Sequence, residues 1–144
     1  MEPISWNESY NTGIEPIDQQ HRRLIEMLNL HLVEGLLDHP LQKASAMLAD
    51  FQNYAEFHFR TEENLAEKSG IHRSTNWLMH AGEHEYYRKR VSDLELLAQS
   101  KPDESAHQLL SFLRYWWTAH IGGSDQRLAD NLRVADPSLN PKNT

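Results

Sequence analysis

Four stretches of the chain carry apolar residues in steps of three and four, and each of these rows also contains histidine. Steps of this size bring side chains to one face of an α-helix, so each row should face a core. The rows are Ile17, His21, Leu24, Ile25, Leu28 and Leu32; Leu48, Phe51, Ala55, His58, Glu62 and Leu65; Trp77, His80, His84, Tyr87, Val91, Leu94 and Ala98; and Leu109, Leu113, Trp116 and His120. A fold that buries these rows must also bury several imidazoles.

No stretch alternates with a period of two, so strands are not predicted. Four amphipathic helices with short connections predict an all-α, antiparallel up-down-up-down four-helix bundle. The 144 residues suffice for one domain with a core. We expect the bundle to occupy residues 1–133, with an extended N-terminal arm over 1–16 and a flexible C-terminal tail over 134–144.

Residues that favour helix ends predict the boundaries. The expected N-caps are Asp18, Ser74 or Thr75, and Asp103, and the expected ends lie near Pro40, Gly70 and Pro102. Gly122-Gly123 should interrupt the fourth helix, and Gln126–Leu132 predicts one more helical piece.

The composition limits the classes of partner. The net charge is −7 without a basic tract, which argues against nucleic acid and anionic membranes as partners. The chain has no cysteine, so thiolate chemistry is excluded and a cytoplasmic location is expected. No apolar run approaches the ~20 residues that span a bilayer, and the first residues do not resemble a secretory signal.

Candidate metal ligands lie in the rows that should be buried. His58 and Glu62 are one helical turn apart and can reach the same ion, although an isolated pair of this kind is usually an exposed surface pair. His21 alone could be a hydrogen-bonded core histidine, and Asp125 alone could cap the last helix. Together, buried imidazoles and carboxylates need partners or a metal. The full set is His21, His58, Glu62, His80, His84, His120 and Asp125.

Asp125 joins this set only if the backbone departs from α geometry. A step of five residues leaves His120 and Asp125 about 140° apart on an ideal α-helix. Gly122-Gly123 lies between them and permits a helix end or a π-type bulge.

Seven ligands are too many for one ion. Two irons, bridged by the two carboxylates and capped by five histidines, account for all of them, although zinc and copper also suit imidazole-rich sites.

The chain resembles the bacterial hemerythrins over roughly residues 6–130. The shared motifs are Trp6…Tyr10-x-Thr12-Gly13-Ile14-x-x-Ile17-Asp18-x-Gln20-His21, His58-Phe59-x-x-Glu62-Glu63, His80-x-x-x-His84 and Trp117-x-x-His120-Ile121-x-x-x-Asp125. The resemblance implies two non-haem irons, one held by His80, His84 and His120 and the other by His21 and His58. Glu62 and Asp125 would bridge them, together with an oxo or hydroxo group.

The resemblance implies reversible binding of O2 at the two-histidine iron, which keeps an open position, and binding of azide there after oxidation. Ile17, Leu24, Ile25 and Trp117 should form the apolar pocket around it. The expected role is storage, delivery or sensing of O2, without enzymatic activity. The alternatives are an O2 or redox sensory domain of a larger signalling protein, such as one with a diguanylate cyclase output domain, and a diiron peroxidase or oxidase. The oligomeric state does not follow from the sequence.

Overall fold

The computed structural model describes residues 2–33 and 40–140, and its described part is built from helices without a strand. The α-helices are α1 (Glu15–Val33), α2 (Pro40–Ser69), α3 (Thr75–Ser100), α4 (Pro102–Ala119) and α5 (Asp125–Ala135). Short 3-10 helices span Glu8–Tyr10 and Pro137–Leu139, and a π-helical segment spans His120–Ser124. The prediction of an all-α bundle is therefore confirmed.

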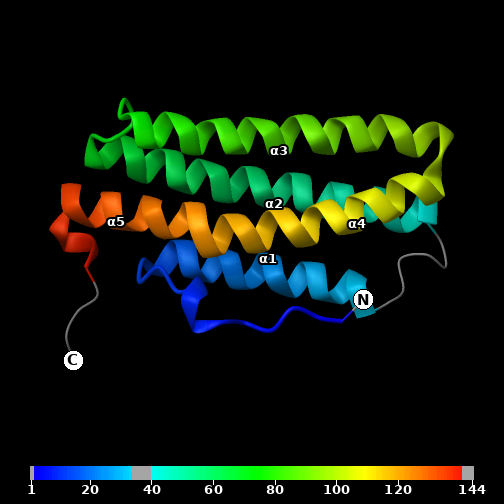
Figure 1. The fold of residues 1–144 in the computed structure, drawn as a ribbon, viewed down its shortest axis with the longest axis horizontal. Coiled ribbons are helices and arrows are strands. Elements are labelled where there is room, and N and C mark those ends of the chain that lie inside the picture. The colour runs from blue at the N-terminus through cyan, green and yellow to red at the C-terminus, as the bar shows by residue number, and fades with distance from the viewer. Residues whose placement is uncertain (1, 34–39, 141–144) are drawn as a thin grey trace.

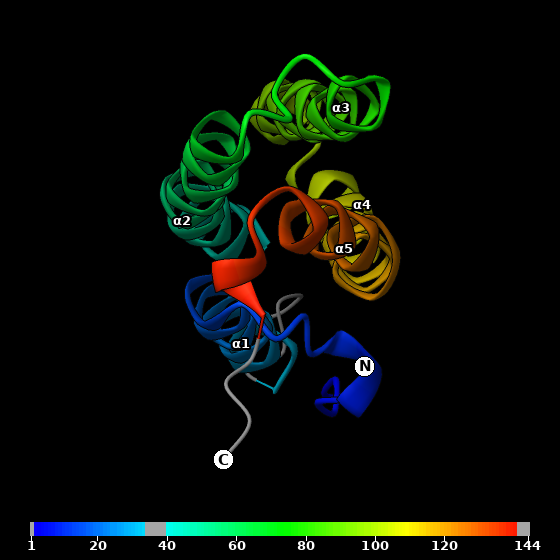
Figure 2. The same ribbon diagram turned by 90° about the vertical axis from the view of Figure 1, so that its left-hand side faces the viewer.

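Four rods make the bundle, because α4, the π segment and α5 follow one another along a single line (Figure 1). The colours along α1, α2, α3 and α4 run alternately in opposite directions, so successive helices are antiparallel. Figure 2 shows the rods end-on, with α5 continuing α4 beside α3. Within the described residues, no helix is long and apolar enough to cross a membrane.

Several predicted helix ends are confirmed. Ser74 is the N-cap of α3, and its hydroxyl accepts a hydrogen bond from the Trp77 N–H at 3.1 Å. Gly70 follows α2 with a φ of 79°, a left-handed conformation that glycine adopts without strain. The predicted end of the first helix near Pro40 falls partly on residues 34–39, which lie outside the described residues. The side chain of Leu48 also lies outside the described part.

Two predicted caps are wrong. The first helix begins at Glu15, because proline fits the first turn and Pro16 can lie inside it. The Asp18 carboxylate instead accepts hydrogen bonds from the Thr12 and Gly13 N–H groups, at 2.8 and 3.1 Å, and holds the arm. Helix α4 begins with Pro102, and Asp103 lies within its first turn.

The N-terminal arm packs along the bundle. The Ile4 N–H donates to Asn29 Oδ1 at 2.6 Å, and Trp6 and Tyr10 pack on the core. At the other end of the chain, Leu139 packs against buried residues. The domain boundary at residue 133 stays a prediction, and residues 141–144 lie outside the described part.

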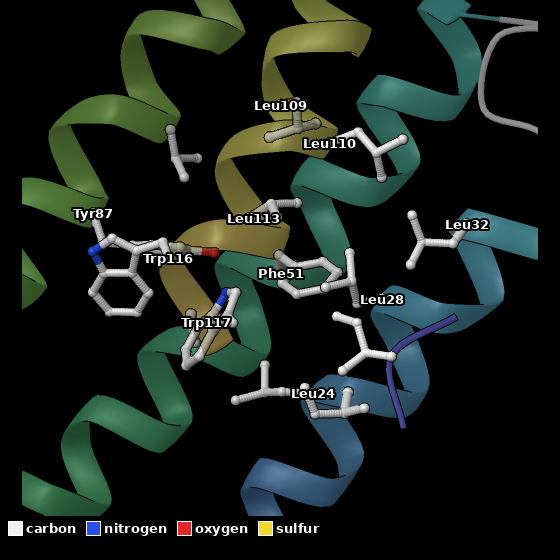
Figure 3. Close-up of a cluster of buried hydrophobic side chains, with 14 of the residues drawn as sticks. Leu24, Leu28, Leu32, Phe51, Tyr87, Leu109, Leu110, Leu113, Trp116 and Trp117 are labelled. Atoms are coloured by element: carbon white, nitrogen blue, oxygen red, sulfur yellow. The ribbon is translucent and has the colours of Figure 1, made fainter. Parts of the chain in front are cut away.

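The core consists of two apolar clusters. The larger one is built around Leu24, Phe51 and Trp117 (Figure 3), and the smaller one includes Ile17, Trp77 and Leu128. On all four rods the chain passes from one cluster to the other through the candidate ligands. The residues are Ile17, His21 and Leu24 on α1; Phe59, Glu62 and Ala66 on α2; Trp77, His80, His84 and Tyr87 on α3; and Trp117, His120, Asp125 and Leu128 along α4 and α5. The polar residues are thus enclosed between apolar layers.

Candidate metal centre

All seven predicted ligands are buried, and they lie together in the bundle interior. His21, His58, Glu62 and Asp125 have no exposed surface, and the other three histidines are at most 5% exposed. The ligand atoms form two groups suited to a metal ion, in each of which the atoms lie within 4.8 Å of one another. Glu62, His80, His84 and His120 form one group, and His21, His58, Glu62 and Asp125 form the other.

Each carboxylate offers one oxygen to each side of the site. Oε1 of Glu62 lies 2.5 Å from His58 Nε2, and Oε2 lies 2.5 Å from His80 Nε2 and 3.4 Å from His84 Nε2. Oδ2 of Asp125 is 2.6 Å from His21 Nε2, and Oδ1 is 3.2 Å from the Nε2 atoms of both His80 and His120. The site is therefore divided into a two-histidine side and a three-histidine side.

The π-helical segment brings Asp125 to the same side of its rod as His120. The wider turn from His120 to Ser124 is closed by the Asp125 N–H, which donates to the His120 carbonyl. The predicted departure from α geometry at Gly122-Gly123 is confirmed. A Cβ on Gly122 would lie 3.4 Å from the Tyr10 ring, so the arm covers this segment closely.

Several ligand atoms are close together without forming hydrogen bonds. Among the described residues, His84 Nε2, His120 Nε2, Glu62 Oε1 and both Asp125 carboxylate oxygens are buried without a partner of hydrogen-bond geometry. Buried polar groups left in this state are costly. Nitrogen and oxygen atoms gathered in this way fit a shared metal ion, and imidazole with carboxylate suits iron.

The same burial and charges shift the pKa values of the ligands. Burial opposes protonation of His58, but the Glu62 and Asp125 carboxylates outweigh it and raise its pKa to about 9. Burial likewise opposes protonation of His80, but the nearby Asp125 and Glu62 carboxylates outweigh it and raise its pKa to about 10. The surrounding imidazoles hold the pKa of both carboxyls well below the usual range, despite burial, so both are ionised.

Aromatic rings fix three of the imidazoles from outside the site. Trp116 stacks on His120, with ring centroids 4.3 Å apart, and Phe59 stacks on His84 at 3.8 Å. Trp77 stacks on His80 at 5.4 Å. These contacts limit ring rotation, so each Nε2 atom keeps its direction toward the site.

Two polar partners of the ligands were not predicted from the sequence. Gln20 Oε1 lies 2.8 Å from His58 Nδ1, and Glu83 Oε2 lies 3.4 Å from His120 Nδ1. Each partner directly precedes a ligand histidine in the chain. Adjacent helix positions differ by about 100°, so neither partner follows from its own row.

The predicted apolar pocket consists of buried residues. Ile17, Leu24, Ile25 and Trp117 are at most 4% exposed, and the Trp117 ring centroid lies 6.0 Å from that of His58. Their role around a bound gas stays a prediction. On the opposite side, a surface pocket of about 220 Å³ reaches His80 and is also lined by Glu83, Ser124 and Arg127.

Fold and site together define a helical-bundle protein with a buried, cysteine-free metal site of histidine and carboxylate. Residues 12–132 match the hemerythrin HHE cation binding domain. The chain is 36% identical over 137 residues to a bacteriohemerythrin of Stenotrophomonas maltophilia, covering 93% of this chain and 84% of the relative. It is 31% identical over 133 residues to one of Pseudomonas aeruginosa, covering 92% and 84%, respectively. The chain belongs to the hemerythrin family.

Proposed function

We propose that the chain is a non-haem diiron protein that binds O2 reversibly for storage, delivery or sensing. The observation that carries this proposal is the division of the two carboxylates, each of which offers one oxygen to either side of the site. Membership of the hemerythrin family supports iron as the metal.

The residues assign different tasks to the two sides. His80, His84 and His120 would hold one iron, His21 and His58 would hold the other, and Glu62 and Asp125 would span both. The two-histidine side has one imidazole fewer, which leaves a position for a small ligand. Reduced irons at these residues would supply the electrons for reversible binding of O2.

The surroundings favour a neutral diatomic molecule. His21 and His58 are fully buried, and Leu24, Ile25 and Trp117 belong to the large apolar cluster. Transfer of an ion into such surroundings is costly, whereas O2 needs no hydration shell. The chain brings no thiolate to the site, and we also propose a cytoplasmic location.

The test is iron analysis followed by rapid mixing of the reduced protein with O2. We expect about two irons per chain and an absorption spectrum that returns to that of the reduced form when O2 is removed. Azide added to the oxidised protein should occupy the same position and change the spectrum. A preparation that holds a single zinc and no iron would refute the proposal.

Irreversible oxidation of the irons without a detectable O2-bound form would contradict the carrier function and favour a redox sensor or an oxidase. The same measurement on a longer natural chain, if an output domain follows this one, would show whether O2 changes the output activity.

A further inference from the structure

One ligand of the three-histidine side has a charged partner outside the site. Glu83 Oε2 lies 3.4 Å from His120 Nδ1, which is long for a hydrogen bond but within reach of a small side-chain shift. The His120 ring stacks on Trp116 with an interplanar angle of 15°, so its Nδ1 atom faces Glu83 in a fixed direction.

Glu83 lies in the lining of the surface pocket together with Ser124 and Arg127. The Glu83 carboxylate opens onto this pocket, where the side chain of a glutamate is ionised at neutral pH. Arg127 donates to the Ser124 hydroxyl at 3.3 Å. The Glu83 side chain is 43% exposed at this pocket, so solvent screens its charge only in part.

The two-histidine side has a neutral partner instead. Gln20 Oε1 lies 2.8 Å from His58 Nδ1, and Gln20 Nε2 donates to the Thr61 hydroxyl at 2.9 Å, which sets the orientation of the amide. Among the described residues, Nδ1 of His21 and Nδ1 of His84 have no hydrogen-bond partner. The two halves therefore differ in the charge of the groups outside the ligands.

We propose that Glu83 is a positioning residue that holds the His120 imidazole with Nδ1 protonated. Its charge makes the Nε2 lone pair a stronger electron donor to the metal, so that the three-histidine iron favours the ferric state. An outer carboxylate fixes the tautomer of a ligand histidine and raises its basicity. A neutral amide, such as that of Gln20, also fixes the tautomer but adds no charge that would raise the basicity. The inference rests on the proposed iron pair.

The test compares Glu83→Gln and Glu83→Ala with the unchanged chain. Glutamine keeps an acceptor oxygen and removes the charge, so iron content should stay while the ratio of oxidised to reduced iron at a fixed potential falls about tenfold. That change corresponds to an upward shift of about 59 mV in the midpoint potential of a one-electron step. Alanine removes the acceptor as well and should also lower iron affinity about tenfold.

Asp130→Asn is the matched control. Asp130 lines the same pocket, is largely exposed and pairs with Arg133, so its replacement removes a charge without losing a contact to an imidazole. Spectroelectrochemistry on the iron-loaded proteins gives the potential, and circular dichroism checks the fold. Equal shifts in Glu83→Gln and Asp130→Asn, or none in Glu83→Gln, would overturn the proposal. An unchanged chain without two irons would instead refute the proposed function itself.

Discussion

Replacing Glu62 with glutamine should damage the site far more than the same replacement at Glu63. The Glu62 side chain is fully buried and contacts His58 and His80 at 2.5 Å and His84 at 3.4 Å. Glu63 is one position further along α2 and points about 100° away. Its side chain is 48% exposed, and it lies 3.6 Å from Arg88.

The contacts set the size of the effect. Replacing a residue that only hydrogen-bonds to a metal ligand lowers metal affinity about 10- to 100-fold. Glu62 contacts both sides directly, and the glutamine NH2 cannot bind a metal. The loss should therefore reach at least about 100-fold, or about 2.7 kcal/mol. Glu63→Gln removes an exposed charge from the Arg88 ion pair, which is worth about 0–1 kcal/mol of folding stability, and leaves iron affinity unchanged.

The assay is anaerobic competition for Fe²⁺ between each protein and a chelator of known affinity. Thermal unfolding of the metal-free forms separates loss of metal from loss of fold. Equal losses of iron affinity in Glu62→Gln and Glu63→Gln would show that the assignment of Glu62 to the centre is wrong.

Three further predictions concern protons, gas entry and the core. Metal binds neutral imidazole, so uptake of Co²⁺ at pH 7 should release about two protons, from His58 and His80, whose pKa values are raised to about 9 and 10; a pH indicator measures the release. Bound metal should be lost below roughly pH 5, and metal analysis that finds it retained at pH 4 would contradict this prediction. Ile25→Trp should slow O2 binding in stopped-flow mixing while iron content stays, with Tyr87→Phe as the weaker control; equal rates would exclude entry past Ile25. Phe51→Ala should lower the free energy of unfolding by about 3–5 kcal/mol in a denaturant titration without changing the iron spectrum, since Phe51 is 1% exposed and lies in the large apolar cluster.

The elements of the fold were predictable because helical periodicity is a local property of the chain. The rows containing His58 and His80 each place apolar and ligand side chains on one face, and this phase is the same whatever the helix packs against. Gly122-Gly123 likewise marked the π segment, because Asp125 follows His120 by five positions, a step that an α-helix does not bring to one face. The caps at Asp18 and Asp103 were wrong, because Pro16 and Pro102 allow both helices to begin earlier.

The contacts between rods depended on the tertiary structure. Helical phase predicts that Glu62 and Asp125 point inward, but it does not say which oxygen faces which histidine. The contacts of Gln20 with His58 and of Glu83 with His120 join different helices, and both partners lie beside the predicted inward rows. Such contacts depend on how far each helix is rotated and shifted against its neighbours. Residues distant in the chain set that packing together, so the sequence determined the set of candidate ligands, and only the assembled bundle decided their partners.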